Sequence, residues 1–478
     1  MALSDAQTRP VASPRAGRGP EQLGSAEFRR DHGVRYAYLA GSMFRGISSP
    51  ELVVRMAQAG LMGFLGTGGL TLSEVDAALR QLRARLGPQG RYGANLLHQL
   101  GDETQELALV DLYHDHGVRC VEASAYTQVT AALVLYRFRG ARLEPGGRFV
   151  TPNRVIAKLS RPEVAAAFLQ PAPEALVLRL LGQDALTPIE AEAARRLPVC
   201  QDLAIESDSA GHSDAGVALA LLPVMTRLRD EAMARHRYPD RVRIGASGGL
   251  GTPEAVAAAF VLGADFVMTG SVNQCTPQAG TSAVVKDLLA ALDVQDTGYA
   301  PAGDMFELGA RVQVVRKGTL FAARGNQLYQ LYRQHDSLEA IDQRTRNTIE
   351  SAWFHRSFED IWHDTCEYFT RRQQTSVLET AQRDPKQRMA LVFRWYFARS
   401  IEAALAGEAA ERVNFQVHCG PAMGAFNRLV RGTSLEPWHA RHVDSIAELQ
   451  MVFGIDDELF AELEQGLTVY QVGGISLT

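Results

Sequence analysis

The sequence predicts an α/β protein, a (β/α)8 TIM barrel with an added helical substrate-binding subdomain. Short apolar segments alternate with longer helical patterns between about residues 34 and 289. Eight such units in about 255 residues match a closed barrel in both number and length. After about residue 290 the strand pattern nearly disappears, and long helical patterns follow. The first part therefore predicts the barrel and the second part predicts the helical addition.

Each apolar segment is short and ends in a polar or glycine-rich stretch. In chain order the segments are VRYAYLAG, LMGFLGTGG, RYGANLL, GVRCVEAS, RVIAKLS, LPVCQDLAIES, RVRIGASGG and ADFVMTG. The stretches between them contain helix formers, as in 50–59, 72–86, 253–262 and 281–292. Strands that alternate with helices form a parallel sheet. An open doubly wound sheet is the alternative, but LAGSMFRG after the first strand lacks the G-x-G-x-x-G pattern of that fold.

The domain boundaries are expected where the composition changes. Residues 1–30 are rich in Pro, Gly, Ala and Arg, and they are predicted to be a disordered arm before the barrel of residues 31–299. The segment GYAPAGDMFELGARVQVV is predicted to be a loop that enters a helical substrate or lid subdomain, residues 300–410. Its helices are expected at 321–334, 337–349, 358–371 and 386–405. Residues 411–478 are predicted to return to the barrel as helices, one of them at 445–463.

Composition excludes several classes of protein. The net charge of −5 gives no reason to expect nucleic acid or an anionic membrane as a partner. A transmembrane helix needs a run of about 18 apolar residues, which the chain lacks, and its start lacks the apolar core of a signal peptide. The five cysteines are scattered and form no C-x-x-C pair, so neither a disulfide framework nor a zinc site is predicted. We expect a cytoplasmic protein without a structural metal.

The functional residues of a (β/α)8 barrel lie at the C-terminal ends of its strands. In chain order these ends contain Ala40, Gly41, Ser42 and Met43; Gly66, Thr67, Gly68 and Gly69; Asn95 and His98; Glu122 and Ser124; Lys158; Glu206, Asp208, Ser209 and His212; Ala246, Ser247, Gly248, Gly249, Leu250 and Gly251; and Thr269, Gly270 and Ser271. Asn95 and Lys158 need partners if they are buried. A flavin ring supplies them, because its carbonyl and N–H edge pairs with an amide and a lysine stabilises charge on the reduced ring. For Lys158 the alternative is a snorkelling or ion-paired lysine of the barrel. The backbone at Gly41 and Ser42 can approach such a ring closely.

The ends of the seventh and eighth strands predict a phosphate site. IGASGGLGTPEAVAAAFVLGADFVMTGS places two glycine-rich turns before helices, where backbone N–H groups and helix N-termini bind anions. The loops after strands seven and eight are the usual phosphate site of the fold. The residues expected to form it are Ser247, Gly248, Gly249, Gly251, Thr269, Gly270 and Ser271. For either turn alone, glycines that only allow a tight turn are the alternative.

The chain resembles the PfaD family of FMN-dependent, trans-acting enoyl reductases, which are related to FabK-type enoyl reductases and nitronate monooxygenases. The resemblance covers nearly everything after about residue 32 and includes the segments GSMFRGISSPELVVRMAQAGLMGFLGTGGL, VIAKLSRPEVAAAFLQPAP, IESDSAGHSD and VHCGPAMGAFN. It implies an FMN-binding barrel and NADPH as the hydride source. It also implies an enoyl thioester on an acyl carrier protein as substrate, within polyketide or polyunsaturated fatty acid biosynthesis. Neither NADPH over NADH nor a homodimer is decided by the sequence.

The segment SAGH is similar to the GGH segment of the related enzymes, with Ala210 where a glycine often stands. The resemblance therefore implies that His212 is the catalytic histidine, which stabilises an enolate or delivers a proton. Asp208 and Asp214 are the neighbouring carboxylates that could raise its pKa, and the alternative is that they face solvent. The residues predicted to bind the cofactor are Ala40, Gly41, Ser42, Asn95, Lys158 and Glu206, together with the phosphate residues above.

The helical part is expected to build an acyl tunnel and a dock for an acidic carrier protein. Candidates for a basic dock are Arg311, Arg316, Lys317 and Arg324, although a solvated helix face explains them equally well. The aromatic run RWYFARS, residues 394–400, suits a tunnel wall or a packed core. Three other functions are considered: a nitronate monooxygenase, a non-catalytic scaffold of a megasynthase, and a dehydrogenase of the inosine monophosphate type with Cys275 as nucleophile.

Overall fold

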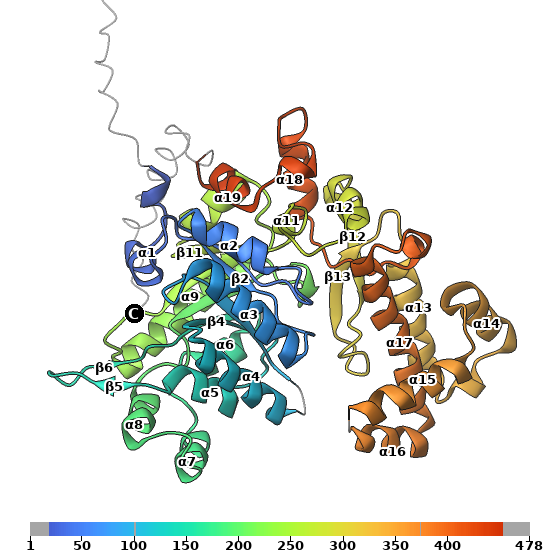
Figure 1. Ribbon diagram of the computed structural model, residues 1–478, viewed down its shortest axis with the longest axis horizontal. Coiled ribbons are helices and arrows are strands. Elements are labelled where there is room, and N and C mark those ends of the chain that lie inside the picture. The colour runs from blue at the N-terminus through green and yellow to red at the C-terminus, as the bar shows by residue number, and fades with distance from the viewer. Residues whose placement is uncertain (1–18, 100–101, 373, 453–478) are drawn as a thin grey trace, which may run out of the picture.

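The computed structural model describes residues 19–99, 102–372 and 374–452. Eight parallel strands close into a barrel, in the spatial order β1-β11-β10-β8-β7-β4-β3-β2. They are β1 (Tyr38–Ala40), β2 (Met62–Leu65), β3 (Gly93–Leu97), β4 (Cys120–Ser124), β7 (Arg154–Leu159), β8 (Asp202–Glu206), β10 (Arg243–Ser247) and β11 (Phe266–Thr269). Every predicted strand segment contributes one of them, so the TIM barrel is confirmed. Figure 1 shows the barrel beside a separate group of helices.

Helices surround the barrel, and some of them begin after a capping side chain or with a proline. They are α2 (Pro50–Gln58), α3 (Leu72–Leu86), α4 (Glu103–His116), α5 (Ala131–Phe138), α6 (Pro162–Phe168), α7 (Glu174–Gly182), α8 (Pro188–Arg196), α9 (Ala218–His236), α10 (Pro253–Val261) and α12 (Ala283–Ala290). Thr71 caps α3 in a capping box with Glu74, and Ser49 caps α2 just before Pro50. The four helices predicted between strands are present as α2, α3, α10 and α12.

Part of the segment predicted as a disordered arm is helical. Helix α1 (Ala26–His32) begins after Ser25, whose side chain accepts a hydrogen bond from the Phe28 N–H. Phe28 is fully buried and stacks on Phe266 at a ring-centroid distance of 4.4 Å. Phe28 and His32 lie one helical turn apart and share a buried face, so α1 closes the N-terminal end of the barrel. The remaining part of the predicted arm, residues 1–18, lies outside the described residues.

The segment predicted as a loop before the helical subdomain is a β-hairpin. Strand β12 (Thr297–Pro301) pairs antiparallel with β13 (Arg311–Val315), which pairs in turn with the short strand β9 (Gly211–His212). In the sequence, Val312 and Val314 alternate with the polar residues Arg311 and Gln313, which is the strand pattern that the loop assignment overlooked. A second small hairpin joins β5 (Arg142–Leu143) and β6 (Phe149–Val150).

The helical subdomain follows the hairpin and has its own apolar core. Its main helices are α13 (Phe321–Gln334), α14 (Gln343–Thr348), α15 (Phe358–Arg371), α16 (Thr375–Arg383) and α17 (Pro385–Ala406). Phe306, Phe321 and Phe397 are buried together in this core. The expected helix 337–349 is interrupted, because a short 3-10 turn precedes α14 and a π-helical turn, Ile349–Phe354, follows it. Helix α16 was not predicted.

The chain then returns to the barrel. Helix α18 (Ala422–Val430) packs against the short helix α11 (Ser271–Gln274), and α19 (Val443–Val452) packs against α10 and α2. The predicted helix 445–463 is thus present up to residue 452, and its remainder lies outside the described residues. In the described part of the chain, no helix combines the length and apolar character needed to span a bilayer. The same part holds no cluster of potential metal ligands.

Candidate functional site

A cavity of about 1390 Å³ opens at the C-terminal ends of the barrel strands and extends along α15 and α17. Twelve of the fourteen predicted site residues line it: Gly41, Ser42, Asn95, Lys158, Glu206, His212, Ser247, Gly248, Gly249, Thr269, Gly270 and Ser271. The other two, Ala40 and Gly251, do not line it. Ala40 is fully buried within β1, and Gly251 packs against α18, where a Cβ atom would lie 2.4 Å from the carbonyl oxygen of Ala422.

The two glycine-rich turns form an open anion cradle. Gly248 adopts a φ of 85°, and a Cβ atom there would lie 2.6 Å from the Ser207 carbonyl oxygen. Cβ atoms on Gly249 and Gly270 would instead meet open space. No residue in the described ranges accepts a hydrogen bond from the backbone N–H groups of Gly249, Gly270 or Ser271. Free donors beside open space fit the phosphate of a nucleotide-like cofactor such as FMN.

A buried charge cluster lies on the floor of the cavity. The Nζ of Lys158 lies 2.7 Å from Oε1 of Glu122 and 3.7 Å from Oε1 of Glu206. Burial lowers the pKa of Lys158, but the charges of Glu122 and Glu206 outweigh it and hold that pKa above its usual value. Burial raises the pKa of Glu206 above its usual value, although the charge of Lys158 acts to lower it. The ammonium group is therefore charged and held in place on the floor of the cavity.

Glu122 was named at the end of its strand but was not among the predicted cofactor-binding residues, although it holds two of them. Besides Lys158, it accepts hydrogen bonds from the Ser42 N–H at 2.7 Å and the Ser42 Oγ at 2.9 Å. Its side chain is fully buried. The available signal was a carboxylate inside an apolar strand segment, because such a group needs partners.

Asn95 presents an acceptor to the cavity. Its Nδ2 donates hydrogen bonds to the Glu122 carbonyl oxygen at 3.1 Å and to Ser124 Oγ at 2.8 Å. Its Oδ1 has no hydrogen-bond partner among the described residues and lies 3.3 Å from where a Cβ atom on Gly68 would stand. The amide oxygen is thus free to accept from an N–H group of a flavin ring.

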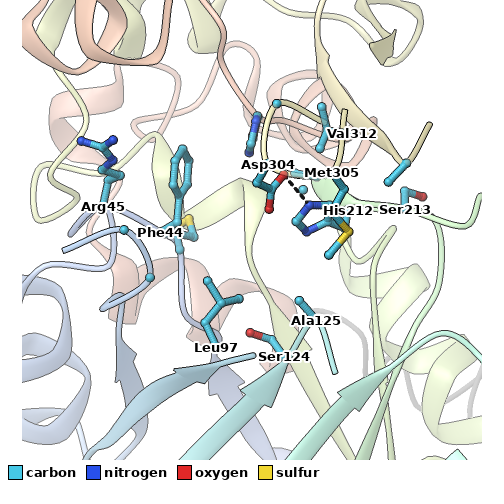
Figure 2. Close-up of a pocket in the computed structure, with 18 of the residues that line it drawn as sticks. Phe44, Arg45, Leu97, Ser124, Ala125, His212, Ser213, Asp304, Met305 and Val312 are labelled. Carbon is cyan, nitrogen blue, oxygen red and sulfur yellow. Dashed lines mark hydrogen bonds and ion pairs between the residues drawn. The ribbon is translucent and has the colours of Figure 1, made fainter. Parts of the chain in front are cut away.

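His212 lies at the mouth of the cavity, paired with an aspartate from the hairpin. Its backbone pairs with Val312 of β13, and its Nε2 lies 2.9 Å from Oδ1 of Asp304, in the turn between β12 and β13. Figure 2 shows this pair facing Phe44 and Arg45 across the hollow, with Leu97 and Ser124 below. Burial lowers the pKa of His212, but Asp304 and Glu206 raise it by more, so it lies above the ordinary value. The pKa of Asp304 is lowered, because the hydrogen bond and charge of His212 outweigh burial.

The carboxylates expected to act on His212 have other partners. Asp208 accepts hydrogen bonds from the Tyr299 hydroxyl at 2.5 Å and from Ser213 Oγ at 2.7 Å. Asp214 pairs with Arg161 at 2.7 Å and accepts a hydrogen bond from Ser160. Asp304, 92 residues further along the chain, takes the role predicted for them.

A second histidine, His418, also lines the cavity. Its ring stacks on Phe44 at a centroid distance of 4.9 Å, and its Nε2 lies 2.8 Å from Nε2 of Gln416. Burial lowers its pKa to about 4, and the charge of His212 acts in the same direction. The sequence offered VHCGP as a motif but no reason to single out this histidine.

The other predicted functional residues divide between the cavity and the rest of the surface. Arg311, Arg394 and Trp395 line the cavity. Arg316, Lys317 and Arg324 do not, and they contact the Gln295 carbonyl, Asp296 and the Trp353 ring respectively. Cys275 is fully buried and lies outside the cavity lining. Of the four candidates for the basic dock, only Arg311 thus lines the cavity, and the buried position of Cys275 outside the cavity argues against a role as nucleophile.

Comparison with known families assigns the two parts of the chain separately. The model of nitronate monooxygenase matches residues 30–302. The model of the inserted helical domain of [acyl-carrier-protein] S-malonyltransferase matches residues 335–415. The first match covers the barrel and the second covers most of the helical subdomain.

Individual relatives extend over both parts. The polyketide biosynthesis protein PksE of Bacillus subtilis is 49% identical over 436 residues, which are 91% of this chain and 56% of that protein. A component of the polyunsaturated fatty acid synthase of Thraustochytrium sp. is 40% identical over 87% of this chain and 28% of its own length. The chain thus spans about half or less of these relatives. The crystal structure of the enoyl reductase domain of MlnA, from the macrolactin cluster of Bacillus amyloliquefaciens, has a TM-score of 0.88 and 44% identity, and covers 94% of this chain and 99% of that domain.

Proposed function

Because the chain belongs to the nitronate monooxygenase family, we propose that it is an FMN-dependent enoyl reductase of that family. It uses NAD(P)H to reduce the α,β double bond of enoyl thioesters on acyl carrier protein. The observation that carries the proposal is the match to the enoyl reductase domain of MlnA, which covers 99% of that domain and includes the helical subdomain. A function that used the barrel alone would not explain why the match includes the helical subdomain.

The cavity suits FMN in both charge and shape. The free N–H groups of Gly249, Gly270 and Ser271 would hold its phosphate. Asn95 Oδ1 and the Lys158 ammonium would contact its ring from the floor of the cavity. A bound FMN would supply hydride transfer between NAD(P)H and the β-carbon of the enoyl group.

The chain's own residues would then handle the proton and the negative charge. The net reaction adds a hydride at the β-carbon and a proton at the α-carbon, while NAD(P)H is oxidised to NAD(P)+. Asp304, 2.9 Å away, raises the pKa of His212 and so favours its protonated form, and His212 lines the cavity, where it can deliver that proton. Lys158 is fixed by Glu122 and remains charged throughout.

The proposed partner is an acyl carrier protein of a polyketide or polyunsaturated fatty acid synthase, to which the enzyme acts in trans. PksE and the Thraustochytrium synthase component, by their names, belong to such systems. The cavity is long enough to continue from the strand ends along α15 and α17, with Trp395 and Arg394 on its wall. An extended arm that carries a thioester fits such a channel.

A nitronate monooxygenase is the second candidate, favoured by the match over residues 30–302. It would use the same barrel and His212 as a base toward a small nitroalkane. That substrate does not need the wall formed by α15 and α17. A base would also work best unprotonated, whereas Asp304 favours the protonated form of His212.

The deciding experiment is anaerobic and follows the flavin absorbance of the purified protein. NADPH should bleach the flavin, and a crotonyl thioester of acyl carrier protein should restore its colour with formation of the butyryl thioester. Protein that binds no flavin, or bleached flavin that a nitronate but not the crotonyl thioester restores, would contradict the proposal.

A further inference from the structure

His418 and Asp304 both lie outside the segments that the two family models match, which end at residue 302 and cover 335–415. Both nevertheless line the same cavity as His212. The barrel match therefore covers only part of the site, and Asp304 and His418 come from segments outside it. Asp304 already has a partner in His212, whereas the role of His418 is open.

The backbone around His418 is firmly held. His418 forms a β-bridge with Val314 of β13, and the Val315 N–H donates to the Val417 carbonyl oxygen at 2.8 Å. Two residues further, the Gly420 N–H donates to Ser271 Oγ at 3.0 Å, which ties the segment to the predicted phosphate turn. A side chain on such a support is positioned before any ligand arrives.

The surroundings of the ring decide which nitrogen bears the proton. Gln416 Nε2 is a donor and lies 2.8 Å from His418 Nε2, so that ring nitrogen accepts. The opposite orientation of the amide would bury unpaired N–H donors in place of the unpaired Gln416 Oε1, which is the costlier arrangement. A neutral imidazole that accepts at Nε2 carries its proton on Nδ1. No described residue accepts a hydrogen bond from His418 Nδ1.

We propose that His418 contacts the substrate and donates its Nδ1–H to the carbonyl oxygen of the enoyl thioester. The inference rests on the proposed function. When hydride from NAD(P)H adds to the β-carbon, the π electrons move toward the carbonyl and an enolate forms with negative charge on that oxygen. A preorganised donor at the oxygen stabilises this charge. The enolate then collapses, the carbonyl re-forms, and the α-carbon takes the proton held by His212.

The protonation states of the two histidines support this division of labour. Asp304 and Glu206 keep the pKa of His212 raised, whereas burial and the charge of His212 keep the pKa of His418 near 4. The two imidazoles in one cavity thus have pKa values that are shifted in opposite directions. Two titratable groups with opposite shifts are the pattern of a site that divides proton transfer from charge stabilisation.

Two isosteric substitutions separate this role from a structural one. His418→Phe keeps a ring to stack on Phe44 but has no N–H, whereas His418→Asn loses the ring and keeps an N–H near the position of Nδ1. Each variant is loaded with FMN and studied anaerobically for the bleaching of flavin by NADPH and its reoxidation by crotonyl-pantetheine. We expect the Phe variant to be reoxidised about 100-fold more slowly and the Asn variant to stay within about tenfold of wild type. Bleaching by NADPH should change less than about twofold in both.

The proposed role of His418 is wrong if the flavin of the Phe variant is reoxidised at the wild-type rate. It is also wrong if the Phe and Asn variants lose reoxidation rate by the same factor. If the Phe variant does not fold, His418→Leu replaces it as the donor-free isostere of Asn. As a matched control, His363→Phe changes an exposed histidine on α15 and should leave both steps unaltered. A wild-type protein that crotonyl-pantetheine cannot reoxidise would instead contradict the proposed function, and so the two failures are distinguishable.

Discussion

The Nζ of Lys158 lies 2.7 Å from Oε1 of Glu122, and the same carboxylate accepts two hydrogen bonds from Ser42. The fully buried Glu122 therefore holds in place both the Lys158 ammonium of β7 and the loop that follows β1. A buried charge that loses its partner destabilises a protein, because its desolvation is no longer compensated. Glu122 thus links the stability of the barrel to the shape of the cavity floor.

Glu122→Gln should lower the free energy of unfolding by about 3 kcal/mol, because Lys158 would keep only Glu206 at 3.7 Å as a charge partner. It should also weaken FMN binding, since Lys158 and the Ser42 loop would lose their support. Denaturant unfolding without cofactor and fluorescence titration with FMN measure the two effects. Glu103→Gln breaks an exposed pair with Arg179 and is the matched control, with an expected change below about 1 kcal/mol. Equal stabilities of the two variants would refute the linkage.

Asp304→Asn should move the pH dependence of enoyl reduction. A proton donor works below its pKa, and Asp304 raises the pKa of His212 against the effect of burial. Removing that carboxylate lowers the pKa, so the fall of the reoxidation rate at high pH should begin at lower pH. The pH profile of flavin reoxidation by the crotonyl thioester measures the shift.

Asp240→Asn, which breaks an exposed pair with Arg148, should leave that profile in place. If the fall of the rate at high pH is unmoved in Asp304→Asn, Asp304 does not control the proton on His212.

The stability that the His212–Asp304 pair contributes also depends on pH. A raised histidine pKa contributes stability below about pH 6.5, and the contribution is lost as the pH rises through the pKa of His212 in the folded protein.

The barrel was predictable because its strands are locally encoded. Every strand consists of a short apolar run with a polar or glycine-rich end, and the position of His212 after the sixth strand follows from that order. The carboxylate that acts on His212 was not predictable, because Asp304 lies 92 residues away in a segment without strand or helix signal of its own. Asp208 and Asp214 are closer in sequence, but Tyr299 and Arg161 respectively contact them in the fold.

The average composition of a segment also led to a wrong prediction at helix α1 and at strand β13. The arm around residue 26 is rich in charge, yet the spacing of Phe28 and His32 places both on one buried face of α1. The hairpin strand β13 is preceded by glycines and a proline, yet Val312, Val314 and Val315 are buried. In both cases a few buried side chains outweigh the average character of the segment, and burial is decided by residues distant in the sequence.

The two glycine turns can be tested with a pair of alanine substitutions. Gly248→Ala puts a Cβ atom 2.6 Å from the Ser207 carbonyl oxygen at a φ of 85°, so it should destabilise the protein by about 2 kcal/mol. Gly270→Ala meets open space and should cost less than about 1 kcal/mol. It should still weaken FMN binding by about tenfold, because the methyl group would occupy the phosphate cradle.

Denaturant unfolding and FMN titration of both variants make the comparison. FMN binding at wild-type strength by Gly270→Ala would place the phosphate elsewhere. Loss of stability in Gly270→Ala equal to that of Gly248→Ala would show that the second turn is not open to a ligand.

Asp202 provides a prediction at the opposite end of the barrel. It pairs with Arg243 at 2.5 Å and with His32 of α1 at 2.9 Å, all within the core. Burial raises the pKa of Asp202, but the charges of Arg243 and His32 outweigh it and lower the pKa to about 2. A lowered carboxylate pKa contributes stability above its ordinary value near 4, and that contribution is lost as the pH falls through about 2.

Asp202→Asn should therefore reduce the free energy of unfolding by about 3 to 5 kcal/mol at pH 7. It should also flatten the decline of stability between about pH 4 and pH 2, because the titrating group is gone. FMN affinity should stay near wild type, since Asp202 lies at the N-terminal ends of the strands and the cavity lies at their C-terminal ends. Glu174→Gln, which breaks an exposed pair with Arg195, controls for loss of a surface carboxylate. If the decline of the free energy of unfolding at low pH is the same in Asp202→Asn as in wild type, protonation of Asp202 is not its cause.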